Sequence, residues 1–282
     1  MSRMSSRTRN GVRYGFLTMA GLVALVPFLY LAANALKTSA ETVTRVSPNP
    51  FSPLFWPQVP QWSNFVTVWV SDQFGDYLLH SVIISTVTLA GVLSTSILAA
   101  YAFAKLKFPG KEGLFALLLA TLMVPETVTL IPDFLIVKAL GWINQLASVT
   151  VPFMAGAFSI FLLRQFFRQI PRDLLDMAKI DGCSHLGVVW RIVVPLSWAP
   201  LSTVAFLDVT NSWNALQWPL VVLQTPDWRP LSVGLARLIS ETGSDVPLRM
   251  AGAVLAILPI FLVYLSAQKQ ITESITAYGL KQ

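Results

Sequence analysis

Six long apolar stretches constrain the fold of this chain more than any other feature of its sequence. Each has close to the length, about 20 residues, that an α-helix needs to cross a hydrocarbon core about 30 Å thick. Only 12% of the 282 residues are charged, whereas about 25% is usual in soluble domains. The sequence therefore predicts an all-α polytopic membrane protein, one transmembrane domain over residues 1–282. The six spans are expected at about residues 15–35, 81–104, 113–133, 147–167, 193–216 and 250–268.

The distribution of charge predicts which side of the membrane each connection occupies. With the N-terminus inside, the cytoplasmic segments hold most of the 20 Lys and Arg residues and fewer than half of the 14 acidic ones. This positive-inside pattern places both termini and the tail, residues 269–282, in the cytoplasm. It also explains the net charge of +6 without nucleic acid. The first span, residues 15–35, is longer than a signal-peptide core, so we expect an uncleaved anchor in the cell (inner) membrane.

The longest connection, residues 37–80, is expected outside the cytoplasm. It is rich in Trp, which favours the membrane interface, and in Pro, which disfavours regular helix or sheet. An ordered coil at the level of the lipid headgroups is therefore predicted, either as a passive linker or as a docking surface. The residues concerned are Pro48, Pro50, Pro53, Pro57, Pro60, Trp56, Trp62 and Trp69.

No residues with a catalytic or metal-binding pattern stand out. Cys183 is the single cysteine, and the only two histidines, His80 and His185, are isolated, so no cluster has metal-ligand spacing. Gly110-Lys111 is followed by Glu112 and lacks the upstream glycine of a phosphate-binding loop. We therefore expect a chain that is not an enzyme, without catalytic residues, metal or cofactor of its own.

A short amphipathic helix is predicted in the cytoplasmic loop at residues 169–191. Pro171 suits the first helical position, Asp173 lies in the first turn where the helix dipole favours an acid, and Gly182 is placed for a left-handed cap. The helix would have about 11 residues and a length of some 16 Å. Leu174, Leu175, Ala178 and Gly182 form its small-to-apolar face. The helix packs either against the membrane and its own bundle or against a partner.

The spacing in this loop is that of a known motif. Asp176-Met177-Ala178 is followed after three residues by Gly182, and after nine more by Ile192-Val193-Val194-Pro195. The segment resembles the EAA loop, E-A-A, three residues, G, nine residues, I-x-L-P, of permease subunits of binding-protein-dependent ABC importers. Asp176, Met177 and Val194 depart from that pattern, and Asp176 keeps the charge of Glu with a shorter reach.

Further stretches resemble the maltose-type, carbohydrate-uptake branch of these permeases, and together they cover the chain from about residue 78 to its end. They are Ala100-Tyr101-Ala102-Phe103-Ala104, Phe108-Pro109-Gly110, Met123-Val124-Pro125, residues 161–167, Trp213-Asn214 and Trp218-Pro219-Leu220. The first 77 residues match only in layout. Related permeases also carry glycerophosphodiesters and other polyols, so the class of solute stays open.

The resemblance implies a set of partners and a coupling site. In this family two permeases form the pore, here with a second permease expected to be a different chain. Two cytoplasmic ABC ATPases bind ATP and Mg, and an extracytoplasmic binding protein delivers the solute. The EAA helix transmits the closing motion of the ATPases to the spans. The resemblance thereby implies ATPase-coupling roles for Leu174, Leu175, Asp176, Met177, Ala178, Lys179, Asp181 and Gly182.

Polar side chains within the apolar stretches are candidates for the solute path. Glu126 and Asp133 are seven residues apart and share a helix face with Thr129, and Glu126 lies about two-thirds of the way across the third span. Span five adds Asp208, Asn211, Trp213 and Asn214. Carboxylates, amides and indole rings suit the hydroxyls and C–H faces of a sugar. Alternatively, Asp133 and Trp213 mark the outer interface, and Asp208 and Asn211 hydrogen-bond between helices.

A self-sufficient secondary transporter of a small polar solute is the alternative function. Such a transporter should show internal repeats, helices interrupted at matching positions and charge pairs for ion coupling. No repeat is apparent in the sequence, and Glu126 has no cationic partner within the spans. The EAA spacing therefore favours the importer.

Overall fold

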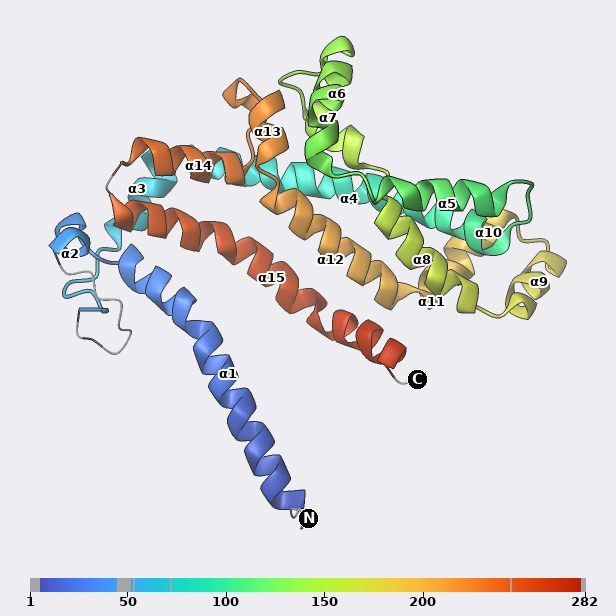
Figure 1. Cartoon of the computed structure of the whole chain (residues 1–282), viewed down its shortest axis with the longest axis horizontal. Helices are drawn as coiled ribbons and strands as arrows, with labels where there is room; N and C mark the ends of the chain where they lie inside the picture. The colour runs from blue at the N-terminus through green and yellow to red at the C-terminus, as the bar shows by residue number, and fades with distance from the viewer. Residues whose placement is uncertain (1–5, 45–51, 53, 72, 244, 280–282) are drawn as a thin grey trace. The chain divides into compact units, whose positions relative to one another are not determined.

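The computed structural model describes residues 6–44, 52, 54–71, 73–243 and 245–279, which form helices and no strand (Figure 1). Parts of the predicted outer loop, including Pro48, Pro50 and Pro53, and the end of the tail lie outside the described residues. The chain divides into two compact units, residues 1–74 with 235–258 and residues 75–234 with 259–282. The all-α fold is as predicted.

The first unit contains the first span and much of the segment that follows it. The predicted coil at residues 37–80 is wrong in part, because α3 has nine helical residues and α4 begins at Phe74, seven residues before the expected start of span two. The physical reason is that no Pro occurs beyond residue 60 in this segment. The helices of the unit are α1 (Ser6–Ala35), α2 (Ser39–Thr44), α3 (Ser63–Ser71) and parts of α14 (Leu231–Glu241) and α15 (Val246–Gly279).

A network of hydrogen bonds holds the outer segment against the end of α1. Lys37 is only 2% exposed, and its Nζ donates to Asn34 Oδ1 (3.2 Å) and to the carbonyl of Leu54 (2.9 Å). The Asn64 amide donates to the carbonyls of Ala35 (2.8 Å) and Lys37 (2.9 Å). A buried ammonium group is costly unless it is hydrogen-bonded. These contacts therefore fix the segment against α1 rather than leaving it as a loose linker.

The second unit holds the remaining spans, which run from α4 (Phe74–Lys105) through α12 (Trp198–Asn214) to the C-terminal part of α15. Its other elements, in chain order, are α5 (Lys111–Thr121), α6 (Glu126–Ala139), α7 (Leu146–Thr150), η1 (Val151–Phe153), α8 (Ala157–Gln169), α9 (Arg172–Ile180), α10 (His185–Val188), the π-helical η2 (Val189–Val193), α11 (Val194–Leu196), α13 (Gln217–Val222) and η3 (Pro226–Trp228).

Two of the six expected spans are sharply bent pairs of helices. Four helical segments are long and apolar enough to cross a membrane: residues 13–35, 74–105, 146–169 and 246–269. Two further spans are bent pairs, with 100° between α5 and α6 and 85° between His185–Leu196 and α12 (Figure 1). The described residues therefore contain four spans, or six if each bent pair counts as one.

Proline explains both bends. The expected helix at residues 113–133 breaks after Thr121, because Pro125 lacks an N–H and adopts an extended backbone, ψ 135°, before α6 starts. The expected span at residues 193–216 begins as α12 only at Trp198, which places Pro200 in the first turn of a new helix, where its missing N–H leaves no hydrogen bond unmade. The positions of both prolines were visible in the sequence, but the angles were not.

Span four is interrupted as well, and α4 supports the interruption. Between η1 and α8 the backbone leaves the helix at Met154, whose carbonyl accepts a hydrogen bond from Thr95 Oγ1. Gly91 permits the close approach, because a Cβ there would lie 2.2 Å from Met154 Cγ. Within a bilayer a freed carbonyl needs such a partner inside the protein.

The hydrogen-bond network at the end of α1 predicts that loss of the Asn64 side chain lowers the stability of this region. Asn64→Ala removes two hydrogen bonds and leaves two carbonyls short of a donor, so we expect a loss of about 1–3 kcal/mol in the free energy of local unfolding. The change is measurable as a lower thermal midpoint of the Trp fluorescence of the detergent-purified chain. Gln58→Ala is the matched control, since the Gln58 side chain is exposed, and an equal shift in both variants would contradict the assignment.

Candidate functional site

The loop between spans four and five contains the predicted short helix, with a defined start and end. α9 begins after Pro171 and comprises nine residues, Arg172–Ile180, rather than about 11. Gly182 has φ +83°, so the left-handed cap predicted there is present. The Gly182 N–H donates to the carbonyl of Lys179 (3.0 Å) and the Cys183 N–H to that of Ala178 (2.9 Å). These two bonds form a Schellman motif, which satisfies the last carbonyls of the helix.

The inner face of α9 is buried in the chain's own core. Leu175 is 4% and Ala178 7% exposed. Both pack in one apolar cluster with Leu163 and Phe167 of α8, with residues of α4 and with Val188, Val189 and Val193 that follow α9. Only Leu175 and Ala178 of the predicted apolar face therefore pack against the bundle, whereas Leu174 and Gly182 are exposed, so the prediction that these four residues form one face is wrong in part.

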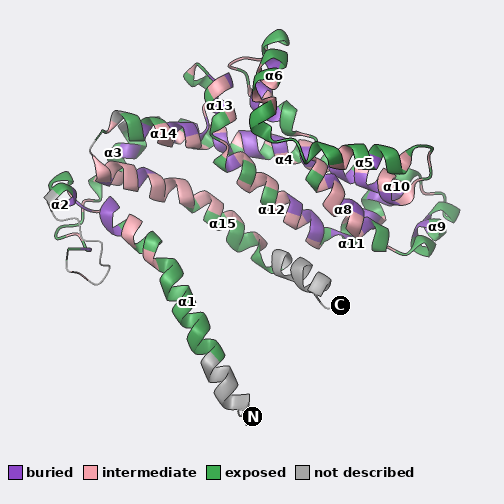
Figure 2. Cartoon of the chain, in the orientation of Figure 1, coloured by how far each residue is buried: buried purple, intermediate pink, exposed green. Residues whose placement is uncertain are grey.

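The outer face of α9 carries a second apolar stripe, which joins Leu174 of the predicted apolar face to two residues that the prediction did not include. Leu174, Met177 and Ile180 recur every third residue and are 45%, 63% and 85% exposed. Beside them, Lys179 Nζ lies 3.8 Å from Asp176 Oδ1, an exposed pair, and Asp181 and Gly182 are exposed as well. Figure 2 shows the change from buried to exposed along this element. The structure thus divides the predicted coupling residues between an inner and an outer face.

The candidate solute-path residues of span three lie on α6, beyond the bend. Glu126 is the first residue of α6 and is exposed, and Thr129 Oγ1 donates to its carbonyl (3.1 Å). Asp133 is half-buried on the same helix, so the shared face with Glu126 is retained. The straight helix along which the depth of Glu126 was counted is absent, because the chain turns by 100° just before this residue.

The candidate residues of span five point in different directions. Trp213 is buried, whereas Asn211 and Asn214 are exposed, and the Asn214 amide donates to the carbonyl of Thr210 (2.8 Å). Asp208 is partly buried, and its Oδ2 is enclosed with no hydrogen-bond partner among the described residues. The four side chains therefore do not converge on one site within this chain.

A buried polar stripe on α4 was missed by the sequence reasoning. Ser85 Oγ donates to Ser212 Oγ of α12 (3.4 Å), and Ser81 Oγ accepts from the Leu231 N–H (2.7 Å). The stripe comprises Ser81, Ser85, Thr88 and Ser96, all less than 5% exposed. Their helical spacing was a readable signal. In the described part of the chain, no three His, Cys, Asp or Glu side chains gather in a way that could hold a metal ion.

Comparisons with known proteins place this architecture in a family. The arabinooligosaccharides transport system permease protein AraQ of Bacillus subtilis is 32% identical over 267 residues, 94% of each chain. The sn-glycerol-3-phosphate transport system permease protein UgpE of Yersinia pestis is 31% identical over 216 residues, 74% of this chain and 77% of UgpE. Each is a relative whose name describes a transport permease.

A solved structure shares the fold. A chain of a bacterial ABC transporter involved in the import of the acidic polysaccharide alginate superposes with a TM-score of 0.83, at 22% identity, over 96% of this chain and 99% of that one. The family described as the binding-protein-dependent transport system inner membrane component matches residues 91–275, well over half of the sequence. The chain therefore belongs to this family of inner membrane permeases.

Proposed function

We propose that this chain is a permease subunit of an ATP-driven importer for a sugar or related polyol. It forms the translocation path with a second permease of different sequence and receives solute from an extracytoplasmic binding protein. Two cytoplasmic ABC ATPases, which bind ATP and Mg, drive it through α9. Both termini lie in the cytoplasm. The solute class is supported by the relatives, whose names specify arabinooligosaccharides and sn-glycerol-3-phosphate.

The two-faced helix α9 is the observation that carries the coupling proposal. Its outer apolar stripe, Leu174, Met177 and Ile180, is exposed in a chain whose inner stripe is already buried. Full burial of a large apolar side chain is worth about 1.5–3 kcal/mol, so this stripe favours contact with a partner. The partner's groove receives the outer stripe, and Asp176, Lys179 and Asp181 form its polar rim. Leu175 and Ala178 transmit the motion to the bundle rather than touching the partner.

The break in span three supports a path between two permeases. Residues 121–128 are all exposed, including the non-helical backbone around Pro125. Irregular backbone at membrane depth is tolerated only where protein or a water-filled cavity covers it. We therefore assign this segment to the face that meets the second permease and the solute. Glu126 and Thr129 stand at that face, whereas Asp208 lies inside the bundle.

The outer stripe can be tested directly. Met177→Glu combined with Ile180→Glu should leave the chain in the membrane but reduce the ATPase recovered with it by about tenfold, the factor for about 1.4 kcal/mol of lost contact. Copurified ATPase is measured by quantitative mass spectrometry. Val43→Glu is the matched control, because Val43 is an apolar residue, 71% exposed on α2, in the segment that the charge distribution predicts to lie outside the cytoplasm. Undiminished recovery with the double variant would refute the assignment.

Gly182 can be tested separately. No atom lies within 4 Å of a Cβ built at Gly182, so a substitution there acts through backbone strain alone. Gly182→Ala should cost about 1–2 kcal/mol at the cap, and Gly182→Val more, because a branched side chain disfavours positive φ further. We expect Gly182→Val to reach the membrane yet fail to couple ATP hydrolysis to uptake, with Gly182→Ala intermediate. Wild-type uptake by Gly182→Val would contradict a coupling role.

The function as a whole is tested by purification of the tagged chain from native membranes in mild detergent. We expect a second permease, ATPase in about twofold stoichiometry and a binding protein, with ATP-dependent uptake after reconstitution. The binding protein's own ligand then identifies the solute. A chain that purifies alone and moves solute in liposomes without ATP would support the secondary transporter instead.

A further inference from the structure

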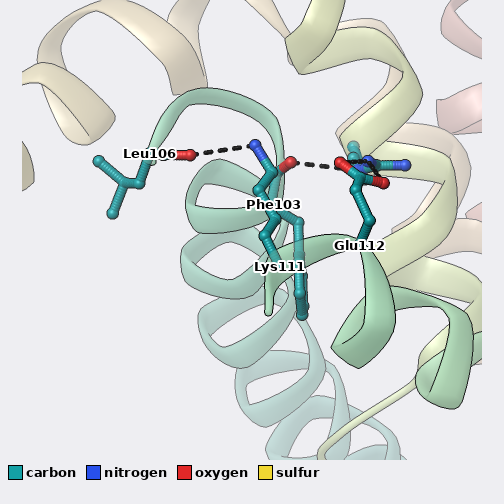
Figure 3. A network of polar contacts seen from close by, with 5 residues as sticks. Phe103, Leu106, Lys111 and Glu112 are labelled. Atoms are coloured by element: carbon teal, nitrogen blue, oxygen red, sulfur yellow. Dashed lines mark hydrogen bonds and ion pairs between the residues drawn. The ribbon is translucent and has the colours of Figure 1, made fainter. Parts of the chain in front are cut away.

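One buried cation, Arg164 of α8, has no role in the function proposed above. Its side chain is 6% exposed, and it contacts two other helices, α4 and α5. Nε donates to the carbonyl of Phe103 on α4 (3.1 Å). Nη2 donates to both carboxylate oxygens of Glu112 on α5 (3.1 and 3.0 Å), and the guanidinium carbon lies 3.7 Å from the ring centre of Phe115. Figure 3 shows Glu112 and Phe103 converging at this point.

The position of Arg164 complements the ends of two helices. Phe103 is in the last turn of α4, where carbonyls lack intrahelical donors and a cation is favoured. Glu112 is in the first turn of α5, where an acid is favoured. A buried charge is retained only with good partners, and this one has a carbonyl, a carboxylate and an aromatic face. One side chain therefore joins the end of α4 to the start of α5.

Two neighbouring lysines bind carbonyls near the end of α8 and in the turn between α4 and α5. Lys105 Nζ donates to the carbonyl of Ile170 (2.6 Å), at the end of α8 and two residues before α9. Lys111 Nζ donates to the carbonyl of Leu106 (3.0 Å) and holds the turn between α4 and α5 (Figure 3). The inner face of α9 already packs with α4 and α8 in one apolar cluster. Arg164 links α5 to this group of helices, α4, α8 and α9. The far end of α5 is the break in span three.

We propose that Arg164 is a positioning residue that binds α5 to the body formed by α4, α8 and α9, so that displacement of α9 reaches the break in span three. This proposal rests on the proposed function, in which α9 is moved by an ATPase. Lysine cannot replace Arg164, since only the planar guanidinium donates in two directions and stacks on Phe115 at the same time. The side chain of Glu112 is 75% exposed, so it stays hydrated when its partner is removed.

The test uses the complete importer, reconstituted with the ATPases, second permease and binding protein that copurify with the chain. The measured quantity is solute taken up per ATP hydrolysed, which does not change when less protein is recovered. For Arg164→Met and Arg164→Lys we expect normal ATPase recovery. The solute taken up per ATP hydrolysed should fall about tenfold, which corresponds to about 1.4 kcal/mol of coupling. Glu112→Gln should lower the same ratio about threefold, because the carbonyl and aromatic contacts remain.

Two controls separate a positioning role from a merely structural one. Arg168→Met removes an exposed arginine from the next turn of α8 and should leave the ratio within about twofold of wild type. The double variant Arg164→Met with Glu112→Gln should be no worse than Arg164→Met alone, since both changes break one linkage. Additive losses in the double variant would overturn the linkage between Arg164 and Glu112.

The remaining outcomes are equally decisive. A wild-type ratio in Arg164→Met overturns the proposal, and if that variant does not assemble, a wild-type ratio in Glu112→Gln does so. A fall in recovery of all variants with an unchanged ratio would reduce Arg164 to a folding role. Should the wild-type chain bind no ATPase at all, the proposed function fails first, and the role of Arg164 with it.

Discussion

Backbone hydrogen bonding is the constraint on which the rest of this structure depends. In a bilayer every N–H and C=O needs a partner within the protein, which is why the described residues are mostly helical along their apolar stretches. The same constraint makes each interruption informative. The carbonyl freed at Met154 is bound by Thr95, whereas the interruption around Pro125 is exposed.

The region of the second unit around α9 uses the same chemistry at its helix ends. The cap at Gly182 closes α9, Lys105 binds the last carbonyls of α8, and Arg164 binds a carbonyl in the last turn of α4. Each is a polar group that completes a terminus which would otherwise lack a partner. Because the inner face of α9 packs into the same core, a force applied to its outer stripe acts on several helices together.

The predictions made from the sequence succeeded where a local rule decides the structure. Apolar length located the spans, and the residue types Pro171 and Gly182 located α9 and its left-handed cap. They failed where two rules compete. Residues 113–133 are apolar enough for a straight span, but Pro125 prevents one, and the outer segment is Pro-rich as a whole, yet its prolines end at residue 60, before α3 begins.

The sequence by itself determined that the chain is helical and membrane-embedded and that a short capped helix lies between spans four and five, because apolar length and capping residues act over a few turns. Only the tertiary structure decided which face of α9 is free. Leu174 and Leu175 are equally apolar, and only the packing of α8 and α4 buries one of them. It also decided that Arg164, Glu112 and Phe103 meet, because contacts between residues 52 and 61 positions apart depend on how three helices pack.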